Sequence, residues 1–372
     1  MRVAVLSVTE NGGALGAAMA QALAVRHETD RYAYARYAGE GQTPFETIDG
    51  LMRERFQTYD AWIFISAAGI AVRAIAPYIV SKRTDPAVVV IDEGARFAIP
   101  VLSGHIGGGN ALARRLGEIT GAQPVITTAT DALGRLSPDV FAAANDLIIT
   151  DFGAAKEVAS AVLAGESVAV MSEYPVTHLP PECVQTAAAG TCRTGICIGA
   201  DPTHRPFPVT LHLVPRNLVL GIGCRRGVPA ERITSHVDAS LKTVCPEGMD
   251  EAAWIRLMHQ RITAVASIDR KADEEGLAAY CEALGITPVF YSAEDLAAVP
   301  DPGAMSGSAA GEGAFSSSAF VEETVGVDNV CERSAVLCSG GRLILPKTAG
   351  GGVTVAAAEI PLTLDAEKEM RW

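Results

Sequence analysis

Two short stretches of this sequence combine small residues with side chains that could do chemistry. Residues 101–110 read V-L-S-G-H-I-G-G-G-N and place His105 among glycines, and residues 124–131 read P-V-I-T-T-A-T-D and close a run of hydroxyls with Asp131. His105 is the only group of the first stretch that can exchange a proton near neutral pH. The predicted chemistry is general acid–base catalysis, with His105 as the base and Asp131 orienting it.

The glycines around His105 would let a ligand approach the backbone closely. Successive N–H groups there can form a concave anion site, and the predicted helix that starts at Asn110 adds a positive dipole end. We expect the 107–110 backbone to cradle an oxyanion or a carboxylate. The residues expected to contact ligand in the two stretches are Ser103, Gly104, Gly107, Gly108, Asn110, Thr127 and Thr128. The alternative is two ordinary turns, in which His105 bonds a carbonyl and the threonines cap a helix.

Charged side chains also follow other predicted strands. Candidate binding residues among them are Arg73, Lys82, Arg225, Arg226, Asp269, Lys271, Glu332 and Lys347. Any one of them alone is more simply explained as part of a solvated surface. Because several cations gather at strand ends in a chain with a formal net charge of -13, together they predict a site for an anionic small molecule.

Apolar runs that alternate with helical patterns predict the elements that hold these residues. Strands are predicted at 2–8, 61–66, 88–92, 124–127 and 218–224, and helices at 14–25, 110–120 and 274–284. Strands and helices that alternate at this interval indicate an α/β fold with parallel, three-layer sheets. We therefore expect a Rossmann-like N-terminal domain over residues 1–138, a smaller middle region over 139–215 and a second α/β domain over 216–372.

Composition excludes several classes of protein. No apolar run reaches the roughly 18–20 residues that cross a bilayer, and the N-terminus reads as a strand rather than a signal peptide, so we expect a cytoplasmic protein. The negative charge argues against nucleic acid as a partner. The eight cysteines include no C-x-x-C pair, and the spacing of Cys183, Cys192 and Cys197 matches no common zinc pattern. Reduced thiols and no metal site are expected.

Two further stretches leave alternatives open. The unit N-G-G-A-L-G after the first strand matches only part of a dinucleotide-binding fingerprint, so a nicotinamide-dependent reductase is the weaker enzymatic alternative. Residues 300–319 are rich in glycine and serine and predict either a mobile lid or a disordered loop.

Several motifs together resemble the cobalt-precorrin-5A hydrolase family. In the first half they are G-I-A-V-R, D-P-A-V-V-V-I-D, L-S-G-H-I-G-G-G-N-A-L-A and P-V-I-T-T-A-T-D. In the second half they are G-I-G-C-R-R-G, A-S-I-D-R-K-A-D-E-E-G-L, V-G-V-D-N-V-C-E-R-S-A and P-K-T-A-G-G-G-V-T-V-A. The resemblance covers nearly the whole chain in the right order and is loosest in the middle region.

The resemblance implies a step of anaerobic cobalamin biosynthesis. The implied substrate is a cobalt-bearing, ring-contracted tetrapyrrole with acetate and propionate arms, one of them closed as a δ-lactone. Water opens the lactone, and the extruded carbon leaves with its methyl group as acetaldehyde. Cobalt arrives inside the substrate, so no cofactor is expected. The residue roles above are inferred from side-chain chemistry and not from the resemblance. A non-catalytic tetrapyrrole carrier is the alternative, and a homodimer is compatible with the sequence.

Overall fold

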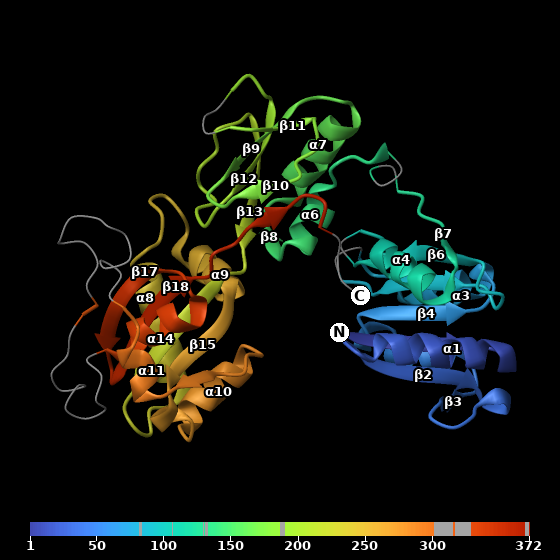
Figure 1. Ribbon diagram of the computed structural model, residues 1–372, viewed down its shortest axis with the longest axis horizontal. Helices are drawn as coiled ribbons and strands as arrows, with labels where there is room; N and C mark the ends of the chain where they lie inside the picture. Colours follow the sequence, from blue (N-terminus) through green and yellow to red (C-terminus); the bar gives the residue numbers. More distant parts are fainter. Residues whose placement is uncertain are drawn as a thin grey trace.

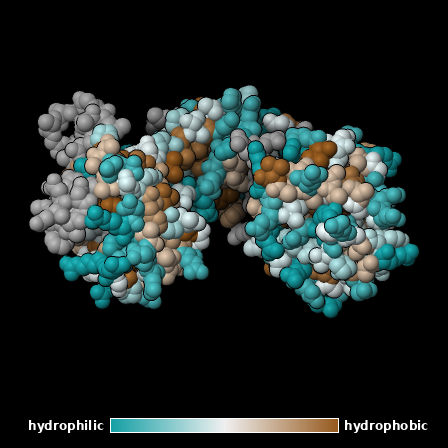
Figure 2. Space-filling model, turned by 60° about the horizontal axis from the view of Figure 1, so that its bottom comes forward, coloured by the Kyte–Doolittle hydropathy of each residue, from teal (hydrophilic) through white to brown (hydrophobic). Residues whose placement is uncertain are grey.

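The computed structural model describes residues 1–81, 84–105, 107–128, 130, 133–186, 190–300, 315–316, 329–368 and 372. Three large sheets divide this part of the chain into an N-terminal, a middle and a C-terminal domain (Figure 1). The N-terminal and C-terminal domains form two lobes separated by a hollow (Figure 2). Within the described ranges, no helix combines the length and the apolar character needed to span a bilayer.

The N-terminal domain is a seven-stranded sheet in the order β3-β2-β1-β4-β5-β6-β7. Its strands are β1 (Arg2–Ser7), β2 (Glu28–Tyr34), β3 (Thr43–Phe45), β4 (Ala61–Ile65), β5 (Ala87–Ile91), β6 (Phe97–Leu102) and β7 (Gln123–Pro124). Its helices are α1 (Glu10–Leu23), α2 (Ile48–Arg55), α3 (Ala68–Ile75) and α4 (Gly109–Thr120). Apolar residues of α1 and α4 pack on one face of the sheet and those of α2 and α3 on the other. The predicted α/β class with a three-layer arrangement is confirmed.

Strand β6 departs from the parallel order that the sequence predicted. It runs antiparallel to β5, and the short β7 runs parallel to β6. Residues 92–96 are too few for a crossover connection, which needs about a dozen residues. They form a tight turn instead, in which the Asp92 carboxylate accepts the N–H groups of Arg96 and Phe97 at 2.9 and 2.8 Å. The carboxyl ends of β6 and β7 therefore lie at the edge where β1, β4 and β5 begin.

The middle domain has a five-stranded sheet in the order β11-β9-β12-β13-β8. Its elements are α6 (Pro138–Ala144), β8 (Leu147–Ile149), α7 (Phe152–Leu163), β9 (Val168–Ser172), β10 (Val176–Thr177), β11 (Cys183–Gln185), β12 (Thr194–Ile198) and β13 (Val209–Pro215). Helices α6 and α7 contribute Phe141 and Val158 to the apolar core on one face of this sheet.

The C-terminal domain has a five-stranded sheet in the order β16-β15-β14-β18-β17. Its strands are β14 (Leu218–Cys224), β15 (Ile262–Ile268), β16 (Val289–Tyr291), β17 (Arg342–Gly350) and β18 (Val353–Glu359). Its helices are α8 (Ala230–Lys242), α9 (Glu251–Arg261), α10 (Glu275–Ala283), α11 (Ala293–Ala297) and α14 (Val330–Ser339). Apart from residues 300, 315 and 316, the segment for which a lid or a disordered loop was predicted lies outside the described residues.

The last part of the chain leaves the C-terminal domain. Strand β19 (Leu364–Asp365) pairs with β10 of the middle domain, and Trp372 packs in the core of the N-terminal domain, where its indole N–H donates to the Gly108 carbonyl at 2.8 Å. In Figure 1 the segment after β18 can be followed from the C-terminal domain past the middle domain. The sequence-based division assigned residues 216–372 to one domain. It differs from the structure because the segment after β18 is too short to show a pattern from which its contacts could be predicted.

A buried polar cluster joins the middle and C-terminal domains. The guanidinium of Arg261, which is 0% exposed, donates to Pro215 O at 3.1 Å, Asn217 Oδ1 at 3.0 Å and Glu359 Oε1 at 2.6 Å. Asn217 Nδ2 in turn donates to the Tyr174 hydroxyl at 3.2 Å. A buried guanidinium is tolerated only when its donors are used, so this cluster fixes the chain where the two domains meet.

Removing the buried member of this cluster should cost far more stability than removing an exposed one. Arg261 and Arg342 both pair with Glu359, but the Arg342 side chain is 76% exposed. Arg261→Ala should lower the free energy of unfolding by about 3–5 kcal/mol, because Glu359 keeps a buried charge. Arg342→Ala should cost about 0–1 kcal/mol. Urea unfolding followed by far-UV circular dichroism measures both, and equal losses would contradict the assignment.

Candidate active site

The two stretches singled out in the sequence meet at one edge of the N-terminal sheet. Asn110, which is buried at the start of α4, donates from Nδ2 to Thr128 Oγ1 at 3.0 Å. His105 Nε2 lies 3.4 Å from Thr130 Oγ1. The contact follows from the fold, because β6 and β7 are neighbouring parallel strands and each stretch begins where its strand ends. The two stretches are therefore in contact, and that they form two walls of one site stays a prediction.

The glycines beside His105 make a compact loop. A Cβ atom at Gly107 would lie 2.4 Å from Ser103 Cβ, and Gly108 has a φ of 80°, which favours glycine. Ser103 itself has a φ of 52°, and its hydroxyl donates to Asp85 O at 3.0 Å. These contacts hold the backbone on either side of His105 and so fix where its ring can point.

The backbone cradle predicted at residues 107–110 is not formed by most of its expected donors. The N–H groups of Gly108, Gly109 and Asn110 donate to the carbonyl oxygens of His105, Ser103 and Gly104 at 2.8, 3.0 and 2.9 Å. The loop therefore uses these donors to close on itself, as the alternative of an ordinary turn implied. An anion bound here would be met mainly by side chains.

A carboxylate from the middle domain stands beside His105. Asp139, in the first turn of α6, has Oδ2 3.6 Å from His105 Nδ1, which is ion-pair range and longer than a hydrogen bond. The two side chains are 25% and 24% exposed, so the pair is shielded but reachable. The predicted orienting residue, Asp131, lies outside the described residues. The structure thus places beside His105 a carboxylate that the sequence-based prediction did not include.

The surroundings of Asp139 keep it ionised. Burial alone would raise the pKa of this carboxyl. The His105 ring, the Ser137 hydroxyl and the Val140 N–H outweigh burial and lower the pKa of Asp139 to about 2. Ser137 Oγ donates to Asp139 Oδ1, and the Val140 N–H donates to the same oxygen at 3.0 Å. Asp139 is therefore a fixed negative charge that favours a proton on the near nitrogen of His105.

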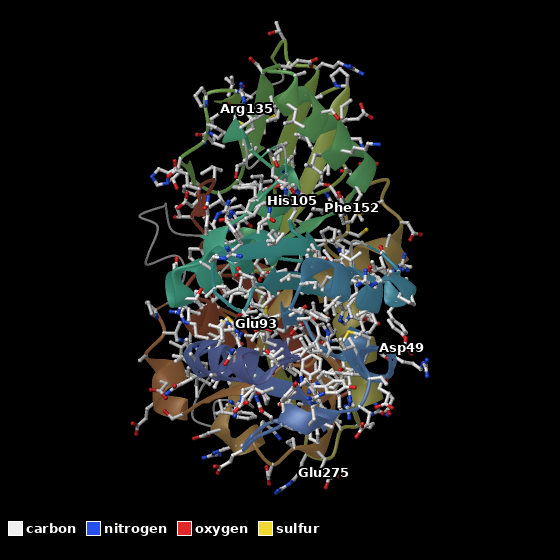
Figure 3. All side chains as sticks on the ribbon, turned by 90° about the vertical axis from the view of Figure 1, so that its right-hand side faces the viewer. Asp49, Glu93, His105, Arg135, Phe152 and Glu275 are labelled. Carbon is white, nitrogen blue, oxygen red and sulfur yellow. The ribbon has the colours of Figure 1, made fainter. Side chains whose placement is uncertain are left out.

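His105 lines a cavity of about 540 Å³ between the N-terminal domain and the middle domain. In Figure 3 it lies near the boundary of the two domains. The wall from the N-terminal domain is mostly small or polar and includes Gly104, His105, Gly108, Asn110, Ala111, Arg114 and Thr130. The wall from the middle domain is largely apolar and includes Leu136, Val140, Phe141, Leu179, Pro180 and Pro181.

Several cationic groups face this cavity. They are Arg114 of α4, Arg135, His178 and Lys368. Arg135 pairs with Glu182 at 3.2 Å, and His178 Nδ1 lies 2.9 Å from Asp365 Oδ1. The hydrogen bond to Asp365 raises the pKa of His178, which favours its charged form. One acidic residue, Glu367, also lines the cavity, so its cationic groups outnumber the acidic ones. An apolar wall, the His105 imidazole and an excess of positive charge suit an organic anion that undergoes proton transfer.

The predicted residues of the C-terminal domain form a separate group. Arg226 pairs with Asp273 at 2.7 Å, Lys271 pairs with Glu274 at 2.8 Å, and Arg225 and Asp269 are exposed. Glu332 is 2% exposed and accepts the Lys347 N–H at 2.7 Å, so its carboxylate holds the chain together. Arg225, Arg226, Asp269, Lys271, Glu332 and Lys347 do not line the cavity at His105.

The remaining predicted residues are scattered. Arg73 is exposed on α3 and Thr127 is exposed after β7, and neither lines the cavity. Lys82 lies outside the described residues.

Sequence reasoning missed the groups that other segments bring to His105. Asp139 stands in S-P-D-V, where an acidic residue beside a proline reads as an ordinary helix start. Arg114 lies within a predicted helix and Lys368 near the end of the sequence, where neither has a local signal. The described part of the chain contains no group of three or more His, Cys, Asp or Glu residues that could hold a metal ion.

All three domains match families of one pathway. Residues 50–131 match the family described as Cobalamin synthesis G N-terminal. Residues 136–215 match the one described as Cobalamin biosynthesis central region, and residues 218–358 match Cobalamin synthesis G C-terminus.

Whole-chain relatives carry related names. The chain is 32% identical to the cobalt-precorrin-5A hydrolase of Salmonella typhimurium, with 91% of this chain and 93% of the relative covered. It is 28% identical to the cobalt-precorrin-5A hydrolase of Priestia megaterium, with 96% and 95% covered. A crystal structure of a cobalamin biosynthesis protein G homologue from Sulfolobus solfataricus aligns with a TM-score of 0.42 and 22% identity over 96% of this chain and 97% of that one.

The charge of Asp139 should make stability depend on pH in a defined window. The pKa of about 2 in the folded protein lies below the ordinary value of 3.8, so the carboxylate stabilises the fold above pH 4. That contribution disappears as the pH falls toward 2. Asp139→Asn should be less stable than the parent chain by on the order of 1–2 kcal/mol at pH 6, and the difference should shrink below pH 4.

Urea unfolding of both proteins between pH 2 and 6 measures this difference. Asp146→Asn is the control, because Asp146 is exposed just beyond the same helix and asparagine also tolerates its φ of 55°. A difference that stays constant over this pH range would show that Asp139 acts through something other than its charge.

Proposed function

The chain belongs to the cobalamin synthesis G family, and on that premise we propose that it is a hydrolase of cobalamin biosynthesis that acts on cobalt-precorrin-5A. The observation that carries the proposal is that His105, whose Nδ1 lies 3.6 Å from Asp139 Oδ2, lines a cavity with an apolar wall and several cationic residues. The substrate is inferred from the family, and the cavity at His105 is the proposed binding site.

The two walls of the cavity suit the two parts of such a substrate. A tetrapyrrole has flat apolar faces and a rim of acetate and propionate arms. The apolar wall, with Phe141 and Leu179, would contact a face of the macrocycle, and Arg114 and Arg135 would bind arms. Guanidinium groups suit this role because they can bind a carboxylate through two parallel hydrogen bonds.

Opening of the δ-lactone requires an activated water. In the proposed step His105 Nε2 accepts a proton from water while the oxygen adds to the lactone carbonyl, and the ring C–O bond then breaks. The imidazolium returns its proton to the leaving oxygen, which becomes a hydroxyl on the extruded carbon, and the new carboxylic acid loses its proton to solvent. Asp139 would hold the proton on Nδ1, which leaves Nε2 as the base and stabilises the imidazolium that forms. The excess of cationic residues in the cavity wall would stabilise the negative charge that develops on the carbonyl oxygen.

Release of acetaldehyde follows from the new hydroxyl. A base removes the hydroxyl proton, the C–C bond to the macrocycle breaks, and its electron pair passes into the conjugated ring system. The same imidazole can serve again once it has lost its first proton. One water is consumed and one acetaldehyde is released. Cobalt belongs to the substrate, and the proposed steps use no resident metal or cofactor.

Loss of the imidazole should stop turnover without loss of the fold. His105→Ala should release acetaldehyde at least 100-fold more slowly than the parent chain, because general base catalysis contributes on the order of 10²–10⁴-fold. His259→Ala is a matched control: His259 Nε2 also contacts an aspartate, Asp238 at 2.6 Å, but lies in the C-terminal domain away from the cavity. Trapping acetaldehyde in single-turnover reactions measures both rates.

The outcomes separate the enzyme from its alternatives. Near-normal release by a folded His105→Ala protein would remove His105 from the mechanism. Tight binding of the corrinoid by the parent chain with no acetaldehyde would indicate the non-catalytic carrier that the sequence left open. A requirement for a nicotinamide cofactor would indicate the reductase alternative.

A further inference from the structure

A second cavity adjoins the one at His105. It has a volume of about 800 Å³ and lies between α1, α4 and the last part of the chain. Ala111, Arg114 and Lys368 line both cavities, so the two spaces share a border. The groups that line the second cavity include four that are permanently cationic near neutral pH: Arg26, Arg114, Arg115 and Lys368.

Positive charge exceeds negative charge in the second cavity. Its two acidic residues already have partners: Glu118 pairs with Arg115 at 2.8 Å, and Asp365 pairs with His178 at 2.9 Å. Among the residues that the structure describes, neither Arg26 nor Lys368 has an ion-pair partner. A local excess of cations in a chain with a net charge of -13 indicates a site for an anion rather than a general surface property.

One residue that lines the second cavity contacts the loop that carries His105. Trp372 lines the cavity, is 6% exposed, and donates its indole N–H to Gly108 O at 2.8 Å. Its ring packs edge-on against His27 at a centroid distance of 5.9 Å. A ligand in this cavity would therefore lie against the structure that supports the catalytic loop.

The first cavity is small for the whole substrate. At about 540 Å³ it falls in the lower half of the 300–1,000 Å³ range of sites for drug-sized ligands, whereas a tetrapyrrole with several acid arms is larger than such ligands. The arms that point away from the lactone need another place. The second cavity lies next to the first, across the border at Arg114 and Lys368.

We propose that the second cavity is a subsite for carboxylate arms of the same substrate, with Arg26 and Lys368 as the residues that bind them while the lactone lies at His105. This inference rests on the proposed function. The subsite fixes the orientation of the macrocycle, because arms held there leave one side of the ring facing His105. Arg26 and Lys368 contact the arms and not the reacting atoms, so they determine affinity rather than the chemical step.

The experiment replaces the two cations and compares the result with a matched double variant. Arg26→Gln/Lys368→Gln should raise KM for release of acetaldehyde about tenfold or more and leave kcat within about twofold, because binding in the ground state and transition state is lost equally. The control, Arg256→Gln/Lys156→Gln, makes the same change in net charge at two exposed residues outside both cavities and should leave KM unchanged. Equal KM values for the two double variants would overturn the subsite.

A binding measurement keeps this test independent of the reaction. Uroporphyrin III, a fluorescent tetrapyrrole with acetate and propionate arms, is titrated into each protein at low and high salt. The parent chain should bind it at least tenfold more tightly than Arg26→Gln/Lys368→Gln at low salt, and high salt should reduce that difference. If the parent chain releases no acetaldehyde, the proposed function fails and this titration alone decides the subsite. Equal affinities at low salt would overturn it.

Discussion

Residues 92–96 connect β5 to β6 by a turn too short for a crossover, and this constraint decides at which edge of the sheet the His105 loop lies. Because β6 and then β7 run against β1, β4 and β5, the loops after them emerge at the edge where the other strands begin. In an open parallel sheet the ligand site is expected at the opposite edge. Here the His105 loop and the threonine stretch share the reversed edge, which faces the middle domain (Figures 1 and 3).

The site is completed by segments from other domains. Asp139 comes from the middle domain and lies 3.6 Å from His105, and Trp372 bonds the Gly108 carbonyl within the same loop. Neither contact exists within the N-terminal domain alone. Any change in how the domains meet would therefore alter the distance between the base and its carboxylate, so the domain contact is itself a part of the proposed catalytic apparatus.

The sequence predicted the elements with strong local signals. The runs at 61–66 and 88–92 form β4 and β5, and Gly121 ends α4 in a left-handed conformation, as a C-terminal glycine should. Strand β6 was not among the predicted strands, because Pro100 interrupts its apolar run. The glycine-rich loop was predicted from the sequence, but the N–H groups of residues 107–110 were expected to donate to a bound anion. They bond the loop instead, since which carbonyls lie within reach depends on the fold of the turn.

The sequence by itself determined the α/β class and the family and drew attention to His105, because strand periodicity, glycine turns and ordered motifs are local properties of the chain. Tertiary structure alone decided the partners of His105. Asp139 lies 34 positions along the chain and Lys368 more than 250, and no local pattern encodes distances between segments that meet only when three domains pack. The same holds for the cations of the C-terminal domain: their residue types suggested one anion site, but the fold places them away from the cavity at His105.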